Sequence, residues 1–189
     1  NGLNGQIFSG DEIDNAVLFD SNTVIDLSRI GSQETKSFIT GILVIRLNEH
    51  RAAMPEMNQA LRHVTVLEEA HHLLKRSAGG QGSEGADITG KAVEMLANAI
   101  AEMRTWGEGF IIADQSPSAV DMAAIRNTNT KIIMRLPEEM DRRTAGKSAT
   151  LSDEQLDELA RLPRGVAVVY QNDWLEPVLC RVSKFESPT

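Results

Sequence analysis

The sequence predicts an α/β fold in which helices cover both faces of a mostly parallel sheet. The first observation is a set of short runs of apolar and β-branched residues, at 64–67, 110–113 and 131–134, as expected for strands buried on both sides. The second is that segments with helical spacing of apolar residues separate these runs. Such alternation of strands and helices is typical of a parallel sheet.

Two short strands are expected near the start of the chain, at 16–19 and 23–27. The turn-forming residues 20–22 separate these two apolar runs. A helix is expected from about Gln33 to His50, because apolar residues recur there at helical spacing.

The central part of the chain is expected to begin with a buried strand at 64–67. A glycine-rich loop, flexible in character, should follow from about 76 to 90. Thr89 is then suited to cap a helix that ends before Gly107, since glycine often follows the last turn of a helix.

A second buried strand at 110–113 leads to Ser116 and Pro117, which suit the start of another helix. Serine is a good helix cap, and proline fits the first helical position. The other expected elements are a strand at 131–134, a helix after 151 that ends near 162–163, and a closing hairpin of strands 166–170 and 175–182.

The helix after residue 151 has the clearest local signal in the chain. Ser152 and Gln155 have the spacing of a capping box, in which each side chain bonds to the backbone N–H of the other residue. Leu151 and Leu156 have the spacing of the hydrophobic staple that often accompanies it.

The composition is that of one ordinary globular domain. The chain has 189 residues and a net charge of −8, and 41% of its residues are hydrophobic. These values exclude a disordered tail, a collagen-like repeat and a disulfide scaffold, and no apolar run has the length of a membrane helix. The single cysteine, Cys180, and the lack of a signal peptide favour a reducing, cytoplasmic location. The acidic balance argues against a generally basic nucleic-acid binder, although a ring could still touch DNA through a few loops.

The strongest candidate for chemistry is the acidic pair Glu68 and Glu69, which directly follows the strand at 64–67. Ligand sites of α/β folds lie at the carboxyl ends of strands. Nucleotide hydrolysis uses one carboxylate beside hydrated Mg²⁺ and another that orients the attacking water, and four apolar residues followed by two acids is the Walker B arrangement. The alternative is a solvated helix N-terminus, where the helix dipole favours acids.

Gln115 and Arg104 are weaker candidates. Gln115 follows the strand at 110–113, where an amide can contact the γ-phosphate or the attacking water; the alternative is a turn or capping residue. Arg104 ends the helix before that strand, and its planar guanidinium suits phosphate; the alternative is a favourable cation at a helix C-terminus.

Two segments mimic a phosphate-binding P-loop without meeting its requirements. The segment 85–92 has the spacing of glycines and lysine, but Ala92 replaces the required Ser or Thr and no strand leads into it. The segment 141–148 ends correctly at 146–148, but Asp141 stands where the first glycine belongs. His71 and His72 lie on different sides of a helical turn, so a zinc site is not expected there.

Taken together, these segments resemble the HerA/FtsK superfamily, particularly the HerA-like ATPases. The Walker B stretch 64–74, VTVLEEAHHLL, and the stretch 101–117, AEMRTWGEGFIIADQSP, carry the resemblance. The segment 127–136 is similar to the strand that follows in that family. The segments 5–8 and 23–28 match the segments that usually precede these motifs in the family.

The resemblance implies a RecA-like ATPase that uses ATP and Mg²⁺. Glu68 takes the Mg²⁺ side, Glu69 activates water, Gln115 senses the γ-phosphate, and Arg104 is similar to the arginine finger that reaches a neighbouring subunit. Glu68 stands where many relatives have Asp. The expected partners are DNA, further copies in a homo-hexamer, and a nuclease.

Relatives of this kind carry the P-loop on a strand that precedes the whole region, and this sequence holds no such strand. The expectation is therefore that residues 1–189 form the C-terminal part of one RecA-like ATPase domain, excised from a longer DNA translocase or helicase and inactive alone. The alternatives are a VirB4- or coupling-protein-like motor of secretion or conjugation, and a non-catalytic α/β interaction module.

Overall fold

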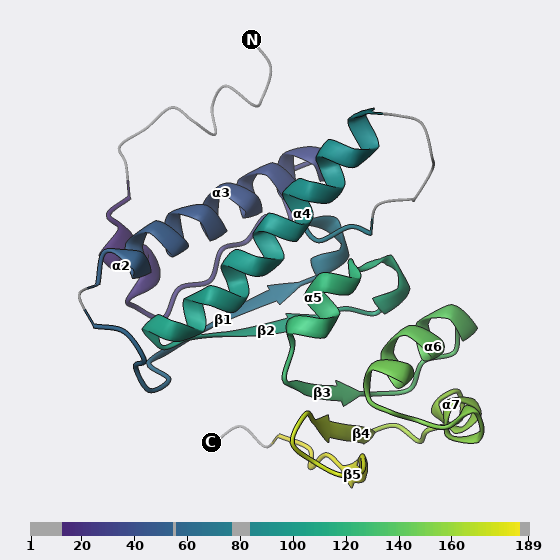
Figure 1. Cartoon of the computed structure of the whole chain (residues 1–189). Coiled ribbons are helices and arrows are strands. Elements are labelled where there is room, and N and C mark those ends of the chain that lie inside the picture. The colour runs from purple at the N-terminus through teal and green to yellow at the C-terminus, as the bar shows by residue number, and fades with distance from the viewer. Residues whose placement is uncertain (1–12, 55, 77–83, 186–189) are drawn as a thin grey trace.

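The structure is a computed structural model of the chain, and it describes residues 13–54, 56–76 and 84–185, with only the backbone described for 84–89. The segment 5–8, which is similar to the family's upstream segment, lies outside the described residues. Figure 1 shows two parts, one built on strands β1 and β2 and the other on β3, β4 and β5.

The first part consists of a parallel strand pair and the helices that lie over it. β1 pairs with β2 so that His63 faces Glu108 and Glu68 faces Ala113. Helices α3 and α4 lie over one face of this pair (Figure 1). The elements are α2 (Asn15–Phe19), α3 (Gln33–Ala52), β1 (His63–Glu68), α4 (Glu84–Glu102) and β2 (Glu108–Ala113).

The face of β1 and β2 that points away from α3 and α4 carries partly exposed apolar side chains in the described residues. Side chains alternate between the faces of a strand. Leu67 is therefore buried against the helices, whereas Val64, Val66 and Ile111 are 41%, 56% and 54% exposed on the other face. Strands β1 and β2 thus carry apolar side chains on both of their faces.

The second part is antiparallel. β3 (Thr130–Ile133) pairs with β4 (Val166–Gln171), and β4 pairs with β5 (Val178–Arg181), which confirms the closing hairpin. The parallel pairing expected from the sequence is formed by β1 and β2. The helices beside these strands are α5 (Met122–Asn127), α6 (Glu139–Ser148) and α7 (Asp153–Leu159).

The two strands expected near the start of the chain are not formed. Residues 15–19 form helix α2, where the Asp14 carboxylate accepts a hydrogen bond of 2.8 Å from the backbone N–H of Ala16. Phe19 is buried against the first core, and residues 23–27 have no regular structure. A four-residue apolar run fits both a strand and a helical turn, and here the cap and the burial of Phe19 favour the helix.

Helices α3 and α7 begin where the sequence predicts them to begin. α3 begins after Ser32, whose hydroxyl accepts from the N–H of Thr35 at 3.3 Å. α7 has the complete capping box, with Ser152 and Gln155 bonded to each other's backbone N–H groups. The predicted capping box is therefore confirmed.

The glycine-rich loop is shorter than expected. Residues 77–83 lie outside the described residues, but α4 is already helical from Glu84, so Gly85 and Gly90 lie inside a helix. The apolar face of α4 packs into the first core, and this burial outweighs a cost of about 1 kcal/mol for each helical glycine. After α4, a 3₁₀ turn, η2 (Met103–Trp106), leads to Gly107 in the left-handed conformation.

The segment after Ser116 is broken into two short pieces instead of one helix. A 3₁₀ turn, η3 (Pro117–Ala119), comes first, and α5 then begins after Asp121, whose carboxylate accepts from the N–H of Ala123 at 2.8 Å. Each part has its own core. The first gathers residues of α3, α4, β1 and α5, and the second gathers residues of β3, β4, α6 and α7.

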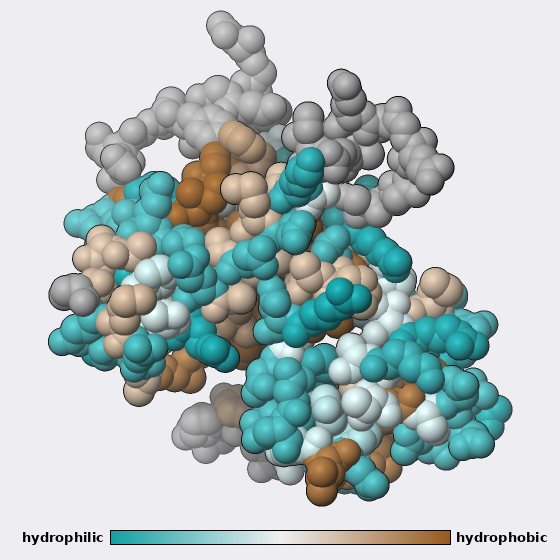
Figure 2. Space-filling model, in the orientation of Figure 1, coloured by the Kyte–Doolittle hydropathy of each residue, from teal (hydrophilic) through white to brown (hydrophobic). Residues whose placement is uncertain are grey.

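The surface of the second part includes exposed apolar side chains at its far edge. Leu175, in the turn between β4 and β5, is fully exposed, and Leu179 of β5 is 64% exposed. Figure 2 shows apolar atoms at the lower edge of the molecule in this view, over the β4–β5 hairpin.

Candidate functional site

The carboxyl ends of β1 and β2 bring the predicted acidic pair and the predicted glutamine to one edge of the sheet. Glu68 is the last residue of β1 and lies opposite Ala113, the last residue of β2. Glu69 follows β1 directly, and Gln115 comes two residues after β2. The structure therefore places Glu68, Glu69 and Gln115 at the same edge, where α/β folds hold their ligands. All three are exposed.

Glu69 has an unusual backbone conformation. Its φ and ψ angles are 49° and 47°, in the left-handed region that side chains other than glycine and asparagine rarely adopt. The turn that follows, η1 (Ala70–His72), is anchored by Ala70 and Leu74, which are 2% and 0% exposed. Packing therefore holds Glu69 in a conformation that costs about 1–3 kcal/mol, and such strain is concentrated at functional sites.

Asp114 links the loop that carries Glu69 to the loop that carries Gln115. Its carboxylate accepts from the backbone N–H of His71 at 2.7 Å and from that of Ser116 at 2.7 Å. It also contacts Nδ1 of His71 at 2.9 Å, and its side chain is 6% exposed. Asp114 was not predicted from the sequence, although its position directly after β2 is the same signal that identified Gln115.

The two histidines of η1 have carboxylate partners on different sides. His71 contacts Asp114, whereas Nε2 of His72 lies 3.5 Å from Oε2 of Glu69. The two imidazole rings lie 4.0 Å apart between their centroids. In the part of the chain that the structure describes, no three His, Cys, Asp or Glu side chains gather closely enough to enclose a metal ion.

Glu68 is suited to a hydrated Mg²⁺ ion and not to an enclosed metal site. Glu68 lies on the same, exposed face of the strand as Val64 and Val66. The structure gives its carboxylate no partner among the described residues. Mg²⁺ prefers oxygen ligands and usually keeps several waters, so one exposed carboxylate at the carboxyl edge fits it.

Arg104 lies apart from the other predicted site residues. It belongs to η2, which precedes the first residue of β2, and the two ends of β2 are roughly 17 Å apart at 3.3 Å per residue. Gly107 follows in the left-handed conformation, with the carbonyl oxygen of Ala60 only 2.5 Å from where a Cβ would lie. This close packing fixes the turn, while Arg104 itself is exposed and has no partner among the described residues.

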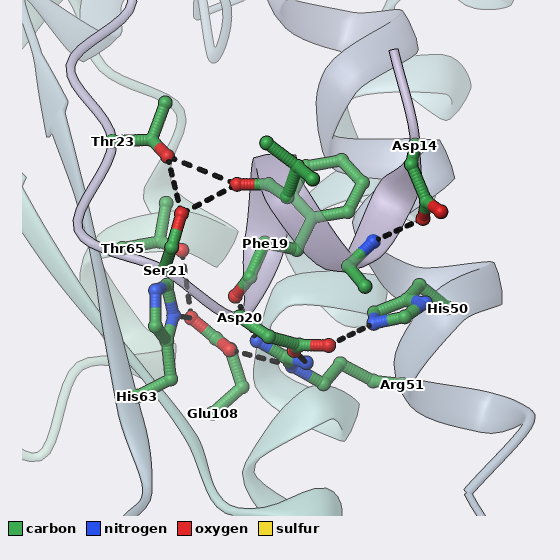
Figure 3. A network of polar contacts seen from close by, with 12 residues as sticks. Asp14, Phe19, Asp20, Ser21, Thr23, His50, Arg51, His63, Thr65 and Glu108 are labelled. Carbon is green, nitrogen blue, oxygen red and sulfur yellow. Dashed lines mark hydrogen bonds and ion pairs between the residues drawn. The ribbon is translucent and has the colours of Figure 1, made fainter.

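A second polar cluster, which we call the amino-edge network, lies at the other ends of β1 and β2 (Figure 3). Arg51 of α3 donates from Nε to Glu108 at 2.8 Å and from Nη2 to the carbonyl oxygen of Phe19 at 2.7 Å, and it also bonds Asp20. Arg51 and Glu108 are 3% and 1% exposed. The other members are His50, which contacts Asp20, and His63 and Thr65, which contact Glu108.

Both segments that mimic a P-loop lie in helices. The segment 85–92 is part of α4, and Gly146 is part of α6. A Cβ at Gly146 would clash with Leu156 of α7, so this glycine allows two helices to pack closely. Neither segment forms the loop that a phosphate cradle requires.

A cleft of about 610 Å³ separates β2 from β3. Ile112 and Gln115 line it on one side, Ile132 and Arg135 on the other, and Ala124 of α5 closes it from the helix side. Figure 2 shows the surface indented between the two parts of the molecule. The edge of β2 that faces the cleft and the edge of β3 that faces it have no strand partner among the described residues.

Sequence comparisons confirm the resemblance read from the motifs, although no family model matches the chain. The chain is 28% identical over 180 residues to the DNA double-strand break repair helicase HerA of Sulfolobus acidocaldarius, covering 94% of this chain and 34% of that protein. It is 29% identical over 124 residues to HerA of Pyrococcus furiosus, covering 65% of this chain and 21% of the relative. The chain thus spans about a third of the length of the first of these relatives.

Solved structures confirm the RecA-like α/β fold. VirB4 of Thermoanaerobacter pseudethanolicus superposes with a TM-score of 0.60 at 15% identity, covering 83% of this chain and 39% of that one. B204, the DNA-packaging ATPase of Sulfolobus turreted icosahedral virus, superposes with a TM-score of 0.58 at 13% identity, covering 97% and 78%. In the described residues, no helix is both long and apolar enough to cross a membrane.

Proposed function

We propose that this chain is the Walker B and sensor portion of an ATP-driven DNA translocase or helicase similar to HerA. The observation that carries the proposal is the carboxyl edge of β1 and β2, where Glu68, Glu69 and Gln115 lie together. The strained backbone and exposed carboxylate of Glu69 support a chemical role for this edge over a purely structural one.

The proposed roles follow from position and side-chain chemistry. The Glu68 carboxylate holds hydrated Mg²⁺ through water, and the ion neutralises charge on the nucleotide phosphates when bound. The Glu69 carboxylate orients and deprotonates the attacking water. Gln115 lies in the loop that Asp114 links to the loop of Glu69, and it offers an amide to the γ-phosphate or to that water.

The phosphate cradle would come from a strand that is not part of this sequence. We propose that this strand lies between β2 and β3, because the facing edges of both strands lack partners among the described residues and a cleft separates them. A strand there would pair with both edges and would end next to Gln115. Its P-loop would then lie at the same edge as Glu68 and Glu69.

Arg104 is proposed to act on the nucleotide of a neighbouring subunit. It is too far from Glu69 to share one phosphate with it, yet it is exposed on a fixed turn and has no partner among the described residues. A homo-hexameric ring around DNA would bring it to the next site, and an arginine finger contributes about 10³–10⁵-fold in rate. A nuclease partner and a cytoplasmic location belong to the same proposal.

A secretion or conjugation motor is the second candidate function. The superposition on VirB4 favours it as far as the fold is concerned, since the TM-score of 0.60 is as high as that for B204. The two candidates differ in cargo, and DNA-stimulated hydrolysis would favour the translocase. A non-catalytic module is less well supported, because Glu69 and Gln115 follow the ends of two paired parallel strands.

Steady-state ATP hydrolysis tests the proposal in the protein that carries this chain together with its P-loop. Glu69→Gln should lower the DNA-stimulated rate by about 100-fold or more, since a general base contributes about 10²–10⁴-fold. Glu102→Gln, at an exposed residue at the end of α4, is the matched control. Normal hydrolysis by the Glu69→Gln variant would show that the assignment is wrong.

A further inference from the structure

The cleft between β2 and β3 has an uneven charge distribution. Its charged lining residues among those described are Asp114, Lys131 and Arg135. The Asp114 carboxylate is already bonded to His71 and to the N–H of Ser116. The cleft therefore presents two cations and no free carboxylate, as a site for an anion requires.

The ammonium group of Lys131 is already bonded to other residues of the protein. Its ammonium group donates to the carbonyl oxygen of Thr128 at 2.8 Å and lies 3.4 Å from Oδ1 of Asn172. Burial lowers the pKa of Lys131, which is the expected effect of removing an ammonium group from water. Lys131 therefore contributes charge to the cleft but has little freedom to follow a ligand.

Arg135 is held at one atom and free at the others. Its Nε donates to the carbonyl oxygen of Ala160 at 3.0 Å, and the structure gives its two terminal nitrogens no partner among the described residues. One bond fixes the plane of the guanidinium while two N–H-bearing atoms remain for a ligand. This geometry suits the oxygens of a phosphate group.

Arg135 also occupies the same position relative to its strand as Gln115. Gln115 comes two residues after the end of β2, and Arg135 comes two residues after the end of β3. The arrows of β1, β2 and β3 run in the same direction in Figure 1, so both residues lie at the carboxyl edge, and both line the cleft.

We propose that Arg135 binds a phosphate group of the nucleotide in its own subunit, across the cleft from Gln115. This inference rests on the proposed function, because it assigns a ligand to the same edge of the molecule. Arg135 and Arg104 then have different roles. Arg135 contacts the nucleotide of its own chain, and Arg104 contacts the nucleotide of a neighbouring subunit.

Nuclear magnetic resonance of the ¹⁵N-labelled chain tests the proposal without hydrolysis. The Nε–Hε signal of Arg135 is followed during titration with sodium tripolyphosphate, and separately with Mg·ATP, up to about 10 mM, the range in which weak binding is detected. The variants are Arg135→Gln, Arg135→Lys and Arg181→Gln. Arg181 is the matched control because it is exposed on β5 of the same sheet, outside the cleft.

The expected result is a shift of the Arg135 signal with both probes and about tenfold weaker binding in Arg135→Gln. Arg135→Lys should bind with intermediate affinity, and Arg181→Gln should bind like the original chain. Equal loss in Arg181→Gln would indicate general electrostatic attraction and overturn the proposal. Equal affinity in Arg135→Gln, or no shift at the highest concentration, would also overturn it.

A duplex oligonucleotide distinguishes the two sources of phosphate. If it shifts the Arg135 signal more strongly than ATP at equal phosphate concentration, Arg135 contacts DNA and the nucleotide assignment is wrong. These outcomes are independent of Glu69, so Arg135 can bind phosphate even if Glu69→Gln hydrolyses ATP normally, and the reverse also holds.

Discussion

The two ends of the β1–β2 pair carry polar clusters of opposite character. At the amino edge, Arg51 and Glu108 are almost fully buried, and both are bonded to protein partners. At the carboxyl edge, the Glu69 side chain is 58% exposed and its backbone is strained. The same two strands thus hold one closed network and one open site.

This difference distinguishes charged groups that stabilise the fold from charged groups that are available to a ligand. Buried ions are tolerated only where every group is paired, and the amino-edge network meets this condition. It joins α2, α3 and β2, and its two buried ions, Arg51 and Glu108, are bonded to other protein groups. The carboxyl edge combines exposed carboxylates with local strain, and this combination is expected where a ligand completes the site.

The largest expected effect comes from breaking the amino-edge network. Arg51→Met should lower the free energy of unfolding by about 3–5 kcal/mol, because it leaves the Glu108 carboxylate buried without its main partner. Urea denaturation measures this change. Arg143→Met is the control, since Arg143 forms an exposed ion pair with Glu139 and its loss should change stability very little. Similar losses in both variants would contradict the comparison.

A smaller loss is expected when the link within the carboxyl edge is removed. Asp114→Ala leaves the N–H groups of His71 and Ser116 without their acceptor and should cost about 2–3 kcal/mol. Hydrogen exchange should speed up at these two amides in particular. Asp173→Ala, in the exposed β4–β5 turn, is the control, and unchanged exchange at His71 and Ser116 in Asp114→Ala would refute the bridging role.

The strain at Glu69 gives a prediction of opposite sign. Glu69→Gly should raise the free energy of unfolding by about 1 kcal/mol, because glycine adopts the left-handed conformation without steric cost. The same substitution in a helix, Glu154→Gly in α7, should lower stability by about 1 kcal/mol. A lower melting temperature for Glu69→Gly would show that the residue is not strained.

The smallest effect concerns acid stability of the amino edge. Burial acts to raise the pKa of Asp20, but hydrogen bonds from Arg51 and His50 outweigh it, so this pKa lies below its ordinary value. A lowered carboxyl pKa stabilises the fold above its unfolded value near 4, and this contribution is lost as the pH falls through the folded-state pKa. Asp20→Asn should flatten the pH dependence of the melting temperature below about pH 4. The exposed Asp157→Asn should leave the dependence as it is.

The sequence predicted that Glu68, Glu69 and Gln115 lie at one edge of the sheet because the signals for this placement are local. Glu68, Glu69 and Gln115 each follow an apolar run that became a strand, and the parallel pairing of β1 and β2 brought them together. Asp114 carried the same signal. The capping box of α7 was also correct, since it depends on four consecutive residues.

The amino-edge network could not be predicted in the same way. Arg51 and Glu108 are 57 residues apart, and nothing near either residue indicates burial. The short run at 16–19 was misassigned as a strand for a related reason, because the burial of Phe19 and the contact of its carbonyl oxygen with Arg51 depend on tertiary structure. The exposure of Val64, Val66 and Ile111 was also not predicted, because a run of apolar residues in the sequence is typical of a strand covered on both faces.

The most direct test of the central claim is single-turnover hydrolysis of pre-bound ATP by the protein that carries this chain and its P-loop. Here Glu69→Gln should bind ATP with unchanged affinity and hydrolyse it about 100-fold or more slowly, because only the activation of water is lost. An amino-edge variant that still folds, such as Thr65→Val, should hydrolyse bound ATP at the original rate. Hydrolysis by Glu69→Gln at the original rate, or an equal loss in Thr65→Val, would contradict the assignment of chemistry to the carboxyl edge.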